Sequence, residues 1–217
     1  MIFNKFKNIV IRFLSFLPDK VFCQLTYFFK HRRLSKLKNP ILFNDKLLSL
    51  KLTERNPLYH KLVDKFEVRD FVSKKIGDKY LIPIIGVYNN VNDIDFYSLP
   101  HKFALKLTNG SQNNLICFDK SKIDWHKSQI EINRWLKKDL YLRTREWPYK
   151  GLKNKIIIEK LIVPKQGDLY DYKFWCFNGV PKFVQIDSGR FKNHRRDFYN
   201  IEFNKKFDYK ITYQNSN

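Results

Sequence analysis

Cysteine is scarce in this chain of 217 residues, and the three cysteines exclude two classes of small protein. Cys23, Cys117 and Cys176 are odd in number and show neither Cys-x-x-Cys nor Cys/His ligand spacing. A disulfide framework and a zinc site are therefore not supported, and a reducing compartment is expected. The five histidines are scattered, and none has a partner at the spacing of a metal or catalytic motif. We expect them to be structural or exposed.

Glycine and acidic residues are also few. The chain has seven glycines, and it contains neither a Gly-Lys-Ser/Thr P-loop nor a glycine-rich dinucleotide fingerprint. Its 42 Lys and Arg against 21 Asp and Glu give a formal net charge of +21, which favours nucleic acid, an anionic membrane face or phosphorylated substrates as partners. Many lysines stand singly among Asn, Ile and Phe, so a general compositional bias explains the charge as well as a binding patch does.

No apolar run is long enough to span a bilayer. The N-terminal stretch Met1–Leu17 is apolar like a signal peptide, but Arg12 interrupts it and Pro18-Asp19-Lys20 stands where a small-residue cleavage site would be. Residues 1–38 are predicted to form a basic, amphipathic helical segment of a cytoplasmic protein. Two interpretations stay open: a helix lying on an anionic membrane surface, and a helical hairpin packed on the domain.

The chain is 43% hydrophobic and 17% aromatic, enough for a buried core in one domain or two small ones. Its periodicity predicts helices, then a small α+β unit, then a β-hairpin layer. Asn178-Gly179 is the strongest hairpin signal, and Pro83 places one strand near a sheet edge or a bulge. The predicted helices span residues 46–52, 61–76 and 128–140, and the predicted strands span residues 80–88, 103–107, 115–118, 155–163, 171–177 and 180–187.

A polar loop with a lysine at its base separates two of these strands, in Lys106-Leu-Thr-Asn-Gly-Ser-Gln-Asn-Asn-Leu115. Consecutive backbone N–H groups in such a turn can point at phosphate oxygens, and the lysine adds a positive charge for the same anion. From these residues alone a plain hairpin turn is the default interpretation.

Seven short motifs follow one another along the chain: Asn39-Pro-Ile-Leu-Phe-Asn-Asp-Lys46, Val63-Asp-Lys-Phe-Glu-Val-Arg69, Ile76-Gly-Asp-Lys-Tyr-Leu-Ile-Pro83, Leu99-Pro-His-Lys-Phe-Ala-Leu-Lys106, Arg145-Glu-Trp-Pro-Tyr-Lys150, Ile156-Ile-Ile-Glu159 and Asp171-Tyr-Lys-Phe-Trp-Cys-Phe-Asn-Gly179. In this order they resemble the teichuronopeptide-biosynthesis family of ATP-grasp proteins, from about Asn39 to Asn200. That family is associated with bacterial surface polysaccharide gene clusters, and its members are thought to join an amino acid or similar amine to a hexuronic acid carboxylate.

The resemblance implies an α+β, ATP-grasp-like fold over residues 39–217, with two α+β subdomains, a nucleotide cleft between them and N-terminal helices before them. It implies ATP and Mg²⁺ as cofactors. The implied partners are a uronic-acid-containing glycan or precursor and an amino acid or amine. ATP would phosphorylate the carboxylate and the amine would displace phosphate from the acyl phosphate, so both steps build negative charge that Lys, Arg and Mg²⁺ can stabilise.

The resemblance also implies roles for individual residues. Lys173 and Arg190 would be catalytic, on strands that line the side where the acyl phosphate develops. Thr108 to Asn114 would be the mobile loop over the phosphates, Glu159 with Lys160 to Ile162 the strand that holds adenine through backbone groups, and Asp168 the ribose-binding acid. The implied nucleotide-binding residues are Lys106, Thr108, Asn109, Gly110, Ser111, Glu159, Lys160, Ile162 and Asp168.

Each role has a structural alternative. Lys106 and Lys173 can be solvent-facing strand lysines, Glu159 a lone strand carboxylate, and Arg190 a partner of Asp187.

The sequence departs from the family pattern in two places. Asn109 and Gln112 replace a His and a Gly of the family's loop, which leaves the backbone less freedom to approach phosphate. The family continues into a segment with the acids that hold Mg²⁺, whereas this chain ends at Asn217. The domain is therefore expected to be C-terminally incomplete, with unassigned metal ligands and weak or absent ligase turnover.

Specific residues also bear on functions other than a ligase. A glycosyltransferase of the same pathway and a catalytically inactive, truncated relic of the ATP-grasp fold are the alternatives to a ligase. Asp93-Ile-Asp95 has the spacing of a glycosyltransferase metal motif, but it lies in a polar connection and is predicted to be a loop acid pair. A nucleic-acid binder is disfavoured, because the aromatic residues alternate with apolar ones at core spacing and no nucleic-acid motif is present.

Overall fold

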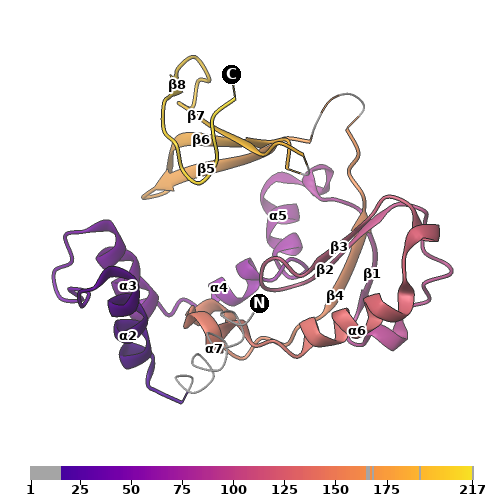
Figure 1. Ribbon diagram of the computed structural model, residues 1–217, viewed down its shortest axis with the longest axis horizontal. Helices are drawn as coiled ribbons and strands as arrows, with labels where there is room; N and C mark the ends of the chain where they lie inside the picture. Colours follow the sequence, from indigo (N-terminus) through magenta and orange to yellow (C-terminus); the bar gives the residue numbers. More distant parts are fainter. Residues whose placement is uncertain (1–15, 165–166, 168, 191, 217) are drawn as a thin grey trace. The chain divides into compact units, whose positions relative to one another are not determined.

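A computed structural model describes residues 16–164, 167, 169–190 and 192–216. The chain divides into two compact units, residues 1–161 and 162–217, and each is considered by itself (Figure 1). The first unit contains helices and antiparallel sheet, and the described part of the second contains antiparallel sheet, so the predicted α+β class is confirmed for the chain. Within the described residues, no helix has the length and apolar character needed to cross a bilayer.

The first unit is built on a four-stranded antiparallel sheet with the order β1-β4-β2-β3. β1 lies at one edge, and its pairing with β4 is irregular between Ile84 and Gly86, as Pro83 predicted. The strands are β1 (Ile84–Tyr88), β2 (Phe103–Leu107), β3 (Asn114–Cys117) and β4 (Ile156–Lys160).

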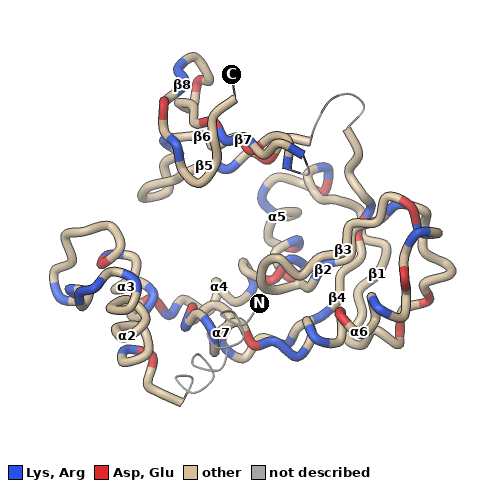
Figure 2. Tube along the Cα trace, in the orientation of Figure 1, with Lys and Arg blue, Asp and Glu red and all other residues tan. Residues whose placement is uncertain are grey.

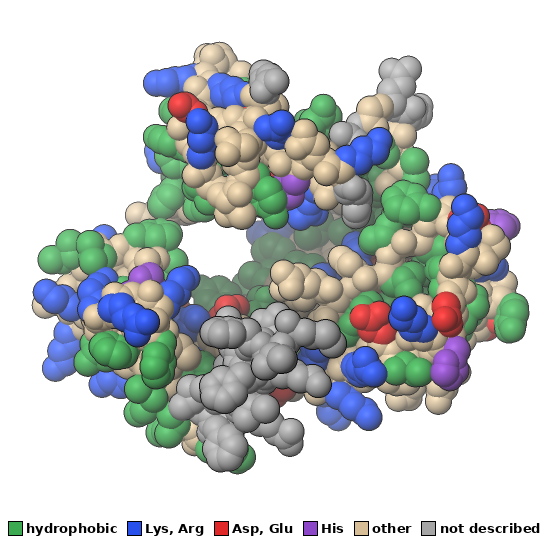
Figure 3. Space-filling model, in the orientation of Figure 1, with side chains coloured by type: hydrophobic (Ala, Val, Ile, Leu, Met, Phe, Trp, Pro, Cys, Tyr) green, Lys and Arg blue, Asp and Glu red, His purple; other side chains and the backbone are tan. Residues whose placement is uncertain are grey.

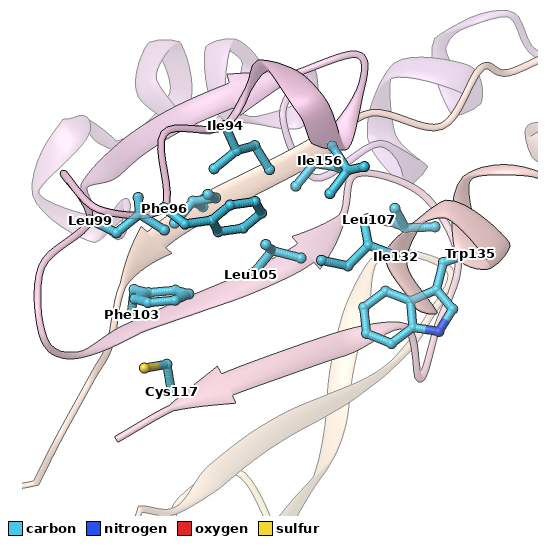
Figure 4. Packing of buried hydrophobic residues seen from close by; sticks show 12 residues of the cluster. Ile94, Phe96, Leu99, Phe103, Leu105, Leu107, Cys117, Ile132, Trp135 and Ile156 are labelled. Atoms are coloured by element: carbon cyan, nitrogen blue, oxygen red, sulfur yellow. The ribbon is translucent and has the colours of Figure 1, made fainter. Parts of the chain in front are cut away.

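One face of this sheet forms the core. Phe103, Leu105 and Leu107 alternate along β2 and are buried beneath α6 (Trp125–Leu136), whose Ile132 and Trp135 point toward them (Figure 4). Because side chains alternate along a strand, the residues between them, Ala104 and Lys106, face the opposite side. The core thus fixes the face on which Lys106 lies.

The predicted helix over residues 61–76 is wrong, because two helices occupy this stretch: α4 (Leu58–Val63) and α5 (Val68–Ile76). At the break, the Asp64 carboxylate accepts hydrogen bonds from the N–H groups of Phe66 and Glu67 at 2.9 and 3.1 Å. Such a local turn competes with helical bonding. Lys65 lies in the same turn, directly after Asp64. Its N–H donates to the Thr108 carbonyl at 2.6 Å, so a backbone hydrogen bond joins the turn to the polar loop.

Three other elements differ from their predicted lengths. The helix predicted over residues 128–140 is divided into α6 and a short α7 (Leu140–Thr144), with Asp139 accepting a hydrogen bond from the Leu142 N–H at the start of α7. The strand predicted over residues 80–88 begins only at Ile84, after a 3₁₀ turn at Asp78–Tyr80. The strand predicted over residues 155–163 is β4, which ends at Lys160.

A helical hairpin precedes the sheet. α2 (Asp19–His31) packs against α3 (Phe43–Thr53) through Phe22, Cys23, Tyr27 and Leu48. Of these two helices only α2 lies in the predicted N-terminal segment, and its partner α3 follows that segment. The part of the segment before residue 16 lies outside the described residues, so both interpretations of it stay predictions.

Two polar contacts hold the hairpin. Hydrogen bonds from Tyr27 and Arg33 hold the pKa of the buried Asp45 at about 2. Asp19, at the start of α2, accepts the Tyr141 hydroxyl at 2.6 Å and lies 3.7 Å from the Arg145 guanidinium, which joins the hairpin to α7.

The second unit is an antiparallel sheet with the order β5-β6-β7-β8. Asn178 and Gly179 have φ values of 50° and 78°, as a tight two-residue hairpin requires, so the predicted hairpin is confirmed. The pairing shifts by one residue between Trp175 and Cys176, which places Asp171 opposite Asp187. The strands are β5 (Asp171–Phe177), β6 (Val180–Ser188), β7 (Arg195–Tyr199) and β8 (Lys206–Phe207).

Candidate active site

Lys106 and Glu159 meet on the face of the first sheet that is opposite the core. Lys106 pairs with Ile157 and Glu159 with Ala104, so the two side chains are diagonal neighbours on adjacent strands. Lys106 Nζ lies 2.8 Å from Oε2 of the buried Glu159. Glu159 is therefore not a lone strand carboxylate, and Lys106 is not simply solvent-facing.

A second cation reaches the same carboxylate from α5. Arg69 Nη1 lies 3.5 Å from Glu159 Oε1, and Arg69 Nη2 donates to the Ile82 carbonyl at 2.7 Å. A buried carboxylate held between two cations positions both of them.

Lys65 brings a third cation to the base of the polar loop. Its Nζ donates to the carbonyls of Leu107 and Gly110 at 3.0 and 2.9 Å. Burial, and then the nearby charge of Lys106, lower the pKa of Lys65 below its ordinary value. Lys65, Arg69 and Lys106 together outweigh the charge of Glu159, so the group suits an anionic ligand. The motif Val63–Arg69 contained this signal, but the sequence reasoning did not assign Lys65 or Arg69 to the site.

The polar loop has a fixed root and an exposed tip. Thr108 is buried; its N–H donates to the Lys155 carbonyl at 2.8 Å, and its hydroxyl accepts from the Lys155 N–H at 3.3 Å. Asn109 is also buried and donates to the Lys153 carbonyl at 3.3 Å. The side chains of Thr108 and Asn109 are thus committed to the fold.

After Asn109, the backbone of the polar loop has N–H groups that are free to donate hydrogen bonds. In the described part of the chain, the N–H groups of Gly110, Ser111 and Gln112 donate to no other group. Gly110 and Gln112 have φ values of 86° and 67°, which turn the chain sharply. Backbone N–H groups in a tight turn can gather around an anion. Nucleotide contact by this loop stays a prediction.

A cavity of about 370 Å³ also borders the loop. Its walls include Asn109, Leu107, Trp135, Lys138 and Arg143, from the loop, α6 and α7. Because Leu107 and Trp135 belong to the core face, this cavity is distinct from the face that carries Lys106 and Glu159.

The remaining predicted nucleotide contacts follow β4. The N–H of Lys160 donates to the Pro83 carbonyl at 3.0 Å, so this backbone group is already used within the sheet. Ile162 is half-exposed at the start of the second unit. Asp168 lies outside the described residues.

In the second unit a fully buried carboxylate, Asp187, gathers the charged side chains. Its Oδ1 lies 2.6 Å from Arg196 Nε, its Oδ2 accepts from Gln185 Nε2 at 3.0 Å, and Lys173 Nζ is also in contact. Burial raises the pKa of Asp187, but the bonds from Arg196, Lys173 and Gln185 outweigh burial and hold the pKa well below its usual value. The ion pair with Asp187 therefore holds the Lys173 side chain in place.

Arg190 joins this group through another acid. Its Nη1 lies 2.5 Å from Asp171 Oδ2, and Lys173 Nζ lies 3.8 Å from the same oxygen. The alternative that Arg190 pairs with Asp187 is thus replaced by a pair with Asp171. The group has more cations than acids, as does the group around Glu159, and Lys173 and Arg190 are its exposed members.

In the described ranges no three Asp, Glu, His or Cys side chains come together as a metal site. Glu159 and Asp187 are occupied by cations. Glu202 accepts a hydrogen bond from Asn200, and Asp208 is exposed. The described residues therefore do not identify the side chains that would hold Mg²⁺.

Asp93 and Asp95 serve in turns, as predicted. Asp95 accepts a hydrogen bond from the Tyr97 N–H at 3.0 Å, and Asp93 accepts from Asn90 Nδ2 at 3.3 Å. Their carboxylates stabilise the local chain and form no metal pair with each other.

Comparison with known families shows that the model of the TupA-like ATP-grasp family matches residues 45–216. The chain belongs to the TupA-like ATP-grasp family. No curated protein and no solved structure matches it. Membership confirms the resemblance seen in the motifs and supports ATP binding and ligase activity for this TupA-like protein. It does not itself identify a substrate.

Proposed function

We propose that this TupA-like protein is an ATP-dependent carboxylate–amine ligase of bacterial surface polysaccharide biosynthesis, of capsule, O-antigen or teichuronic type. It joins an amino acid or amine to a uronic acid in a glycan or its precursor. The observation that supports this most is the repeated charge arrangement. In each unit a buried carboxylate, Glu159 or Asp187, positions cations that outnumber the acids around them.

These cations match the charges of the proposed reaction. ATP supplies a phosphoryl group to the uronate carboxylate with ADP as leaving group, and the amine nitrogen then displaces phosphate and loses a proton as the amide forms. Lys106, with Lys65 and Arg69 beside it, binds nucleotide phosphate oxygens. Lys173 and Arg190 stabilise the negative charge that develops on the acyl phosphate.

The decisive assay is the release of ADP by the purified chain. Release that requires both a uronic acid and an amine supports the ligase. ADP release that does not depend on the uronic acid or on the amine would point to another activity. Transfer of a sugar from a sugar nucleotide without ADP release would point to a glycosyltransferase. Absence of ADP release, together with no ATP binding, would identify an inactive member of the family.

Lys106→Ala is expected to weaken ATP binding by about 1.5 to 3 kcal/mol, because it removes one charge-assisted bond to a phosphate. Isothermal titration calorimetry measures this change. Lys102→Ala is the matched control, since Lys102 is an exposed lysine just before the same strand. Equal affinities for the two variants, with unchanged thermal unfolding, would show that Lys106 does not bind the nucleotide.

We also propose a cytoplasmic location at the inner face of the cytoplasmic membrane. The part of the chain before the sheet is basic and rich in large apolar side chains. Surface attachment, which needs no spanning helix, suits these residues.

A further inference from the structure

The third helix, α3, carries apolar side chains on two opposite faces. Leu48 is buried against α2, and Leu52 packs beside it. Phe43, Leu47 and Leu50 recur at helical spacing on the other side and are 58%, 48% and 51% exposed. One face of α3 thus completes the hairpin core, and the other is left uncovered among the described residues.

The apolar surface continues beyond α3. Ile41 and Leu42, just before the helix, are 79% and 54% exposed. Phe29 at the end of α2 and Leu34 after it are about as exposed. Large apolar side chains gathered on one short hairpin, rather than scattered singly, mark an interaction surface.

The charges around this surface are almost entirely positive. The cations of residues 16–55 are Lys20, Lys30, Arg32, Arg33, Lys36, Lys38, Lys46, Lys51 and Arg55. Of the acids in the same range, Asp45 is buried against Arg33 and Asp19 is bonded to Tyr141, which leaves Glu54. Figure 2 shows Lys and Arg along both helices, and Figure 3 shows their side chains between hydrophobic ones over the α2–α3 hairpin.

We propose that the outer face of α3, formed by Phe43, Leu47 and Leu50 and extended by the exposed Ile41 and Leu42 directly before the helix, docks on an anionic lipid bilayer. The apolar side chains enter the boundary between headgroups and acyl chains. The lysines lay their aliphatic parts along that boundary and place their ammonium groups among the lipid phosphates. The inference rests on the proposed membrane location and is independent of the ligase chemistry.

Charge complementarity favours a bilayer over a second copy of the chain. Two copies that met through this face would bring the same cations together, with Glu54 as the nearby acid that could offset them. An anionic bilayer supplies both the apolar layer and the compensating charge.

Vesicle sedimentation with the full chain tests this. Binding is expected to vesicles of phosphatidylcholine and phosphatidylglycerol in a ratio of about 7 to 3, to fall as salt rises, and to be weak with phosphatidylcholine alone. The triple variant Phe43→Gln, Leu47→Gln, Leu50→Gln should bind about tenfold more weakly or worse. Its control is Tyr97→Gln with Ile130→Gln, which removes exposed apolar side chains on the opposite part of the unit.

A second set of variants keeps the test decisive if the apolar variant does not fold. Lys36→Gln, Lys38→Gln and Lys46→Gln change exposed lysines of the hairpin and should also lower binding about tenfold or more. Lys102→Gln, Lys127→Gln and Lys137→Gln remove the same charge elsewhere and should lower it less. Equal losses for the two lysine sets would overturn the proposal. So would loss of a dimer, measured by light scattering, in the apolar variant.

Discussion

Asp187→Asn is expected to destabilise the second unit by about 3 kcal/mol or more, because it leaves Arg196 and Lys173 in place beside a neutral side chain. Asp187 is fully buried and Arg196 is largely buried, so water replaces the lost interactions only in part. Asp171→Asn is the matched control. Asp171 faces Asp187 in the same pair of strands but is partly exposed, and its loss should cost about 1 kcal/mol or less.

Denaturant unfolding followed by circular dichroism measures both values, and the pH dependence gives a second readout. The pKa of Asp187 is depressed in the folded chain, so its contribution is fully present above the ordinary aspartate pKa of about 3.9 and is lost as pH falls through the lower folded value. The gap in stability between the wild type and Asp187→Asn should therefore narrow below about pH 4. Equal stability of the two proteins at pH 7 would refute the structural role of Asp187.

With the proposed role of Arg190, Arg190→Gln is expected to lower the ligase turnover that the chain shows by about 100-fold or more, because it removes a positive charge from the proposed site of the acyl phosphate. Arg190 is the better test than Lys173, since Lys173 also contacts the buried Asp187 and its loss would affect folding. Arg190 is exposed and pairs with Asp171, so its substitution should leave the unfolding temperature nearly unchanged.

Steady-state ADP release separates a catalytic role from a binding role. A fall in kcat with little change in the KM for ATP, and partial recovery in Arg190→Lys, fits stabilisation of a developing charge. Lys192→Gln removes a nearby exposed charge and serves as the control. If Arg190→Gln and Lys192→Gln turn over alike, Arg190 has no part in the chemistry.

The sequence predicted β1 to β6 but not β7 or β8, and the β5–β6 hairpin shows a further limit of the prediction. Asn178-Gly179 fixes the turn, and counting back from it with regular pairing would place Lys173 opposite Val184. The shift between Trp175 and Cys176 instead places Lys173 opposite Gln185 and Asp171 opposite Asp187. A one-residue shift exchanges the faces of a strand, and it is what brings Asp187 to the side of Lys173. The extra residue is Lys182, directly after Pro181, and a proline inside a central strand is itself a signal of a bulge that the prediction did not use.

The first unit shows the same limit for helices. The spacing of apolar residues correctly located Lys106 on a strand, but it joined α4 and α5 into one helix. Asp64 ends the first helix through bonds to its own backbone, and the Lys65 N–H then finds the Thr108 carbonyl, 43 residues later in the sequence. The spacing of apolar residues within one segment does not reveal a tertiary contact of this kind. This contact places Lys65 beside the polar loop.

The contact between Asp19 and α7 has a consequence for how a docked chain would stand on a bilayer. Tyr141 and Arg145 hold the first turn of α2, so the hairpin is not a tether on a free linker. With its outer face in the headgroup layer, the sheet that carries Lys106 would be kept at a constant height and tilt above the lipid. The distance between the bilayer and the proposed ligase site would then be set by the folded first unit and not by the length of a flexible linker.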